Sequence, residues 1–153
     1  MIEQFLRSSA LFRDLDNEDL THVLMVGLLK RYPVETVILN EGTPGGQLHI
    51  INQGRVRISK VVPGVGEEAL TILGPGDFFG EVEFFDGAAA SAHAIAHSEC
   101  EIFTIPHQEV RAMMDSHPAI CAKFLWAFSR TLAGRLRESN QKISSLFAIA
   151  REF

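Results

Sequence analysis

The residue types best suited to chemistry lie together in the stretch Leu73-Gly74-Pro75-Gly76-Asp77-Phe78-Phe79-Gly80-Glu81-Val82-Glu83-Phe84-Phe85. Glycine and proline predict a turn that delivers the chain to Gly80, followed by one helical turn over residues 81–85. Such a helix start presents backbone N–H groups to an anion. The Glu81 carboxylate can accept a hydrogen bond from a sugar hydroxyl. A structural turn that buries aromatic side chains explains the same residues, so both interpretations stand at this point.

Other reactive side chains do not form a convincing centre. His93, His97 and Cys100 invite a metal interpretation, but on a strand the third would point away from the first two, and no second cluster supplies a fourth ligand. Cys121 precedes an apolar helical run and is expected to be a small buried side chain. The sequence therefore predicts no metal site.

Acid–base catalysis is not expected either. Glu81 and Glu83 are two residues apart, so on a helical turn their side chains diverge. The chain contains no Gly-x-Ser-x-Gly or Walker A motif. We expect a protein that is not an enzyme.

Composition restricts the protein class. The chain has 153 residues, which is enough for one domain, and 46% of them are apolar. Fourteen Lys and Arg residues against nineteen Asp and Glu residues give a net charge of −5, which argues against a general nucleic-acid binder. Two cysteines are too few for a disulfide scaffold. No signal peptide or transmembrane run is evident, so a cytoplasmic protein without membrane association is expected.

Glycine placement predicts the architecture. Ten of the twelve glycines lie between Gly42 and Gly87, where tight turns separate short β-prone runs. The ends lack such turns and show helical spacing. The expected fold is α+β, in one domain over residues 1–153, with N-terminal helices at 2–29, short strands that form a β-sandwich, jelly roll or barrel at 34–105, and C-terminal helices at 107–151. Asp16 and Asp19 mark a helix start, and the apolar series of that helix continues to Leu28.

The last helix is expected to begin at Pro118 and to run to about Ala150. About 30 residues would span some 45 Å, longer than one small domain covers. A homodimer through this helix is therefore predicted, with Trp126 packed at the seam. The alternative is that the first half packs on its own domain while the tail frays. The apolar stripe assigned to dimerisation is Phe124, Phe128, Leu132, Leu136 and Ile143.

The ordered set of these motifs resembles the cyclic nucleotide-binding domain family. Residues 11–15 are similar to its opening, 37–42 to the start of its β-roll, and 48–56 to its strand–turn–strand. Residues 76–81, Gly-Asp-Phe-Phe-Gly-Glu, resemble its phosphate-binding cassette, and Pro118 fits the start of its last helix. The resemblance implies an eight-stranded β-roll flanked by helices, with a cyclic nucleotide such as cyclic AMP or cyclic GMP inside it. It also implies that the glutamate of the Gly-Glu pair contacts the ribose 2′-hydroxyl, and that an arginine contacts the phosphate.

The cassette of this chain departs from that pattern. The family's arginine position falls on Ala90, and no Arg or Lys occurs between Lys60 and Arg111. Glu83 and Asp86 add negative charge. The ligand-binding residues implied by the resemblance are Phe79, Gly80, Glu81, Val82, Ala90 and Ser91. A protonated His93 could substitute for the arginine, although an ordinary strand position is the favoured interpretation.

These features predict a non-catalytic regulatory module of bacterial signalling, with weak, altered or lost cyclic AMP binding, acting through dimerisation and contacts with an unidentified protein partner. The alternative is a genuine sensor whose ligand reorients the C-terminal helix. Because the chain stops at Phe153, no DNA-binding domain is expected in it. A DNA-binding regulator is a further alternative if the chain is truncated.

Overall fold

A computed structural model describes all residues from Met1 to Phe153. The chain folds as two short helices, eight strands interrupted by one helix, and two final helices. Their bounds are α1 (Ile2–Ser8), α2 (Asn17–Val26), β1 (Leu28–Tyr32), β2 (Val37–Leu39), β3 (Gln47–Gln53), β4 (Val56–Val62), β5 (Gly66–Leu73), β6 (Phe78–Phe79), α3 (Glu81–Asp86), β7 (His93–Ala96), β8 (Cys100–Pro106), α4 (His107–Ser116) and α5 (Pro118–Ala150).

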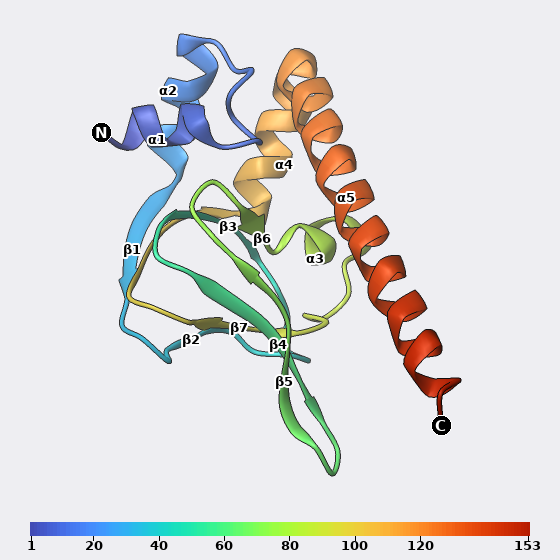
Figure 1. Ribbon diagram of the computed structural model, residues 1–153. Coiled ribbons are helices and arrows are strands. Elements are labelled where there is room, and N and C mark those ends of the chain that lie inside the picture. The colour runs from blue at the N-terminus through green and yellow to red at the C-terminus, as the bar shows by residue number, and fades with distance from the viewer.

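The eight strands form two antiparallel four-stranded sheets, which confirms the predicted α+β fold with a β-roll. One sheet has the order β1-β8-β3-β6 and the other β2-β7-β4-β5. Figure 1 shows the roll at the centre, with α1, α2 and α4 gathered at one end and α5 running along one side. The helix α3 lies between the roll and α5 (Figure 1). The fold therefore places the Gly-Glu cassette beside the last helix.

The predicted start of the strands at residue 34 is too late, because the first strand, β1, already begins at Leu28. Asp16 caps α2 as expected, accepting a hydrogen bond of 2.8 Å from the Asp19 N–H. However, the helix ends before Gly27, and Leu28 begins β1 rather than continuing the helix. Residues of β1 pair with β8, which lies more than 60 residues later in the chain. Helical spacing of leucines is a local signal and cannot detect hydrogen-bond partners that distant.

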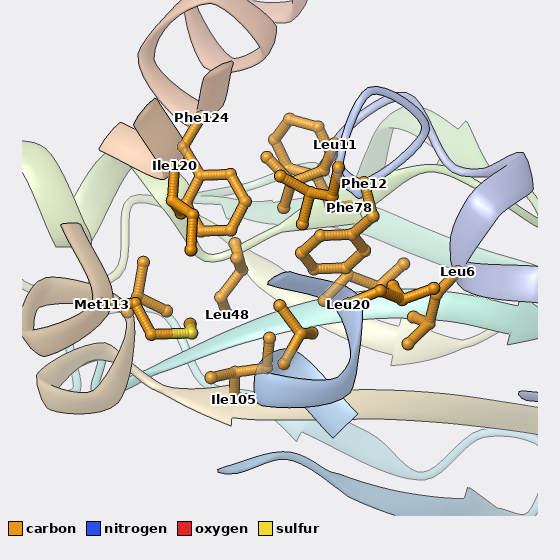
Figure 2. Packing of buried hydrophobic residues seen from close by; sticks show 14 of the residues in the cluster. Leu6, Leu11, Phe12, Leu20, Leu48, Phe78, Ile105, Met113, Ile120 and Phe124 are labelled. Atoms are coloured by element: carbon orange, nitrogen blue, oxygen red, sulfur yellow. The ribbon is translucent and has the colours of Figure 1, made fainter. Parts of the chain in front are cut away.

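The main core lies where the end helices meet the roll. Figure 2 shows apolar side chains from the N-terminal helices, from the strands and from α4 and α5 converging on one cluster. A second cluster fills the space between the two sheets and includes Phe79 and Cys100. The Cys100 thiol donates to the Arg55 carbonyl oxygen at 3.0 Å, and burial raises its pKa. Cys100 is therefore a structural side chain.

The helix α5 is divided into a buried first part and an exposed remainder. Pro118 occupies its first turn, as predicted. Phe124 and Phe128 are 0% and 1% exposed in the core of their own chain, so their assignment to a dimer seam is corrected. Phe124 packs edge-to-face against Phe12, and Phe128 packs edge-to-face against Phe78 of β6; Figure 2 shows Phe124 in this core. Leu132 is half-buried, whereas Leu136 and Ile143 are exposed.

No helix in the structure has both the length and the apolar character needed to cross a lipid bilayer.

Candidate functional site

A cavity of about 830 Å³ lies between the sheet β2-β7-β4-β5, α3 and α5. Five of the six predicted ligand-binding residues line it: Phe79, Gly80, Glu81, Val82 and Ser91. A volume of this size is typical of small-molecule sites. The cassette therefore faces a cavity large enough for a ligand.

Ala90 is the exception among the predicted residues. It is 3% exposed and does not line the cavity. Its backbone is held by the neighbouring loop, since the Ala90 N–H donates to Thr43 at 2.9 Å and its carbonyl accepts from Gly42 at 2.8 Å. The structure therefore does not bring Ala90 to the cavity with the other five predicted residues, and its side chain is a buried part of the roll.

Gly80 sets the geometry of the cassette. It has φ of +90° and ends β6 just before α3, so the predicted helical turn after it is confirmed. A Cβ atom at this position would lie 2.4 Å from the Gln47 carbonyl oxygen, which explains the need for glycine. The His107 Nε2–H donates to the Gly80 carbonyl at 2.8 Å. Burial lowers the pKa of His107, which favours this neutral, donating imidazole.

The Glu81 carboxylate is buried and paired with the last helix. The Glu81 side chain is 2% exposed and accepts a hydrogen bond from Arg135 Nη1 on α5. Arg135 Nη2 donates to the Phe78 carbonyl, and the guanidinium carbon lies 5.3 Å from the centre of the Phe78 ring. Burial raises the pKa of Glu81, while the positive charge of Arg135 opposes that shift. Arg135 thus connects the cassette to α5.

Glu83 also lines the cavity, in a fixed position. Its Oε1 accepts a hydrogen bond of 3.4 Å from the Ser91 N–H. Gly45 packs closely against its stem, because a Cβ atom at Gly45 would lie 2.8 Å from Glu83 Cβ. Asp86 instead accepts from the Ala88 N–H at 2.8 Å and does not line the cavity. Of the two carboxylates expected to repel an anion, only that of Glu83 is placed to do so.

Four basic side chains from outside the cassette line the cavity: Lys60, Arg130, Arg135 and Lys142. Lys60 pairs with Glu41 at 3.3 Å. Lys142 pairs with Glu138 at 3.4 Å and donates to the Leu70 carbonyl at 2.6 Å. Only Arg130 has no hydrogen bond or ion pair. Sequence analysis missed Arg135, although it lies seven residues after Phe128, two helical turns along the same buried face.

The predicted histidine and cysteine alternatives separate in space. The His93 Nδ1 accepts from the Glu41 N–H at 3.1 Å at the start of β7. His93 also lines the cavity, and its Nε2 lies 3.8 Å from Glu41 Oε2, so both ring nitrogens contact Glu41. His97 Nδ1 lies 3.1 Å from Arg57 Nη1 on the exposed surface, whereas Cys100 is buried.

Comparisons with known proteins agree with this geometry. The sequence pattern of the cyclic nucleotide-binding domain family matches residues 29–117. A CRP-like cAMP-activated global transcriptional regulator of Mycobacterium tuberculosis is 33% identical over 115 residues, which cover 75% of this chain and 50% of that protein. The Thermus thermophilus cyclic AMP receptor protein is 28% identical over 141 residues, covering 92% of this chain and 63% of that protein.

A solved cyclic nucleotide-binding domain from Methylobacillus flagellatus has a TM-score of 0.81 and 26% identity, covering 93% of this chain and 80% of that chain. The chain spans about half the length of the Mycobacterium tuberculosis regulator that it matches. With a family pattern over more than half of its residues, an eight-stranded roll and a Gly-Glu cassette facing a cavity, the chain belongs to the cyclic nucleotide-binding domain family.

Proposed function

We propose that this chain is a non-catalytic, homodimeric regulatory module of the cytoplasm, in which the cavity is linked to the α5 dimer helix and cyclic AMP binds weakly. The observation that carries the proposal is the Glu81–Arg135 pair. It joins a buried cassette carboxylate to a helix whose second half carries exposed apolar side chains, among them Leu136, Ile143 and Phe147. A change at the cavity can thereby alter the position of α5.

Weak binding of cyclic AMP follows from the cassette. The family's phosphate contact includes an arginine, and its position here holds the buried Ala90. A hydrogen bond involving a charged group contributes roughly 1.5–3 kcal/mol, or about 10- to 150-fold in affinity. Glu83 adds a carboxylate bonded to the Ser91 N–H, beside the position where the resemblance places the phosphate.

The exposed face of α5 supports the dimer. Of its 33 residues, only Ile120, Phe124 and Phe128 are buried. The exposed face follows a heptad repeat, with one series at Trp126, Ala133, Asn140 and Phe147 and the second at Ser129, Leu136, Ile143 and Ala150. Two helices that pair along such a seam bury apolar side chains, and an asparagine within the seam favours a two-helix coiled coil in a single register. Leu132 lies beside this seam.

The sensor alternative uses the same contacts. A ligand hydroxyl that donates to Glu81 competes with the Arg135 guanidinium for the same carboxylate. Release of Arg135 shifts α5 only if the ligand has different affinities for the two helix positions. The two functions therefore differ in whether ligand binding changes the α5 seam.

Two measurements test the proposal. Light scattering at micromolar concentration is expected to give about 34 kDa, twice the 16.9 kDa of one chain. Replacing both Leu136 and Ile143 by glutamate is expected to give monomers, whereas replacing the exposed Arg137 by alanine is not. A wild-type mass near 17 kDa would refute the dimer.

Calorimetric titration of cyclic AMP to millimolar concentration tests the ligand. We expect weak binding, with a dissociation constant above about 100 μM, that Glu81→Ala abolishes. Binding at tens of micromolar or tighter would favour the sensor alternative, and a change of dimer mass or helix crosslinking on ligand addition would establish it.

A second candidate function is the effector part of a transcription regulator. It is favoured by the 33% identity to a regulator of which this chain spans half. The test is DNA-binding anisotropy with the complete native gene product, in parallel with residues 1–153. DNA binding by the complete product alone would support this candidate, and its absence from both would exclude it.

A further inference from the structure

The charged groups around the cavity are unevenly available to a ligand. Lys60, Arg135 and Lys142 are each engaged with a carboxylate of the protein. Arg130 is exposed and also lines a second, smaller surface pocket beside Trp126. The cations that line the cavity wall are thus largely neutralised before any ligand enters.

Hydrogen-bond acceptors, by contrast, face the cavity at the cassette. Glu81 is buried with one oxygen bonded to Arg135, and Glu83 is half-buried with one oxygen bonded to the Ser91 N–H. Each carboxylate has two oxygens and several lone pairs, so each retains the capacity to accept from a ligand. Groups that donate hydrogen bonds, such as hydroxyls, match this end of the cavity, whereas an anion would face the Glu83 carboxylate, which pairs with no cation of the protein.

The remaining wall suits a flat apolar group. Leu39, Ile58, Leu73, Val82 and Ala94 line the cavity along its strands and α3. Apolar lining with a few fixed polar groups is the common arrangement of small-molecule sites. A heterocyclic base against the strands and a sugar with hydroxyl donors against the carboxylates would satisfy both parts of the wall.

We propose that the cavity takes an uncharged nucleoside in preference to the corresponding cyclic nucleotide, and that Glu83 is the residue that sets this preference. This inference rests on the proposed function, because it assumes that the cavity is the ligand site of the module. Glu83 is suited to the role because Gly45 lies against the first carbons of its side chain and the Ser91 N–H donates to its Oε1 at 3.4 Å, which directs the carboxylate toward the cassette loop.

The test is calorimetric titration of the full chain with two matched pairs of probes, adenosine with cyclic AMP and guanosine with cyclic GMP. In the wild type, one nucleoside is expected to bind at least tenfold more tightly than its cyclic nucleotide. Glu83→Gln preserves the size of the side chain and an oxygen that accepts from Ser91, but removes the charge. It is expected to reduce that preference at least about fivefold, the factor that corresponds to a repulsion of ~1 kcal/mol between two like charges about 4 Å apart in water.

Asp86→Asn is the matched control. It removes a negative charge three residues later on the same helix, outside the cavity, and is expected to change the preference by less than about threefold. Circular dichroism and thermal unfolding of each variant establish that it is folded before titration.

Each outcome separates the inference from the proposed function. Tighter binding of the cyclic nucleotide by the wild type would overturn the nucleoside preference while leaving a ligand-binding module. A nucleoside preference unchanged in Glu83→Gln, or changed equally in Asp86→Asn, would overturn the role of Glu83. Absence of binding by all four probes would overturn the whole inference, whereas the dimer is decided independently by light scattering.

Discussion

Removing Arg135 is the perturbation whose effect the structure specifies best. Arg135→Met keeps most of the aliphatic stem but removes the guanidinium that pairs with Glu81 and donates to the Phe78 carbonyl. Breaking a fully buried ion pair costs roughly 3–5 kcal/mol, since the remaining charge is left without compensation. The Glu81 side chain is 2% exposed but that of Arg135 is 30% exposed, so we expect a smaller loss of about 2 kcal/mol in the free energy of unfolding.

That loss corresponds to a decrease in Tm of roughly 4–8 °C for a chain of this length. Urea unfolding at pH 8 measures the loss of unfolding free energy. The control is Arg137→Met, because Arg137 is exposed on the same helix and makes no hydrogen bond or ion pair. In a double-mutant cycle, Glu81→Gln combined with Arg135→Met is expected to recover at least about 1 kcal/mol relative to additive losses, since no buried charge then remains.

The pH dependence gives an independent check. Burial raises the pKa of Glu81, and loss of Arg135 raises it further. Between the unfolded and folded pKa values the folded Arg135→Met variant binds more protons than its unfolded state, so its stability falls as pH rises. The penalty is therefore expected to be smaller at pH 5 than at pH 8. Equal losses at both pH values, together with a coupling energy near zero, would refute the assignment of Arg135 as the counter-charge of Glu81.

Three further predictions concern the fold and the dimer. Burial lowers the pKa of His49 to about 4, so below about pH 6.5 the unfolded state binds more protons than the folded state. The free energy of unfolding is therefore expected to fall by about 3 kcal/mol between pH 6.5 and 4, and urea titrations of His49→Gln should lack this decrease. Gly54 and Gly64 both have positive φ, but only at Gly54 would a Cβ atom lie 2.1 Å from a backbone oxygen. Gly54→Ala should therefore prevent folding or lower the free energy of unfolding by several kcal/mol, whereas Gly64→Ala should lower it by about 1 kcal/mol; similar Tm values for the two variants would contradict this. Phe128→Ala should lower the free energy of unfolding by about 3–5 kcal/mol, because the Phe128 ring is buried. Phe147 is 68% exposed, so Phe147→Ala should mainly raise the dimer dissociation constant; the opposite pattern would place the dimer seam elsewhere.

Local patterns in the sequence determined the fold class and the position of the cassette. Glycine placement between Gly42 and Gly87 predicts short strands in a β-sandwich, jelly roll or barrel, because glycine marks tight turns without reference to the rest of the chain. The cap at Asp16 and the start of α5 at Pro118 are likewise local and are confirmed. The resemblance predicts Gly80 and Glu81 as ligand-binding residues, and both residues line the cavity.

Tertiary structure alone decided the charge environment of the site and the division of α5. Counting charges along the chain suggested a cassette without cations, yet α5 brings Arg135 to Glu81 across 54 residues of sequence. The apolar residues of α5 that were predicted to form one dimer seam serve two surfaces. Phe124 and Phe128 are buried in the core of their own chain, whereas Leu136 and Ile143 are exposed. Sequence periodicity identifies an apolar face, but which surface covers it depends on how elements distant in sequence pack.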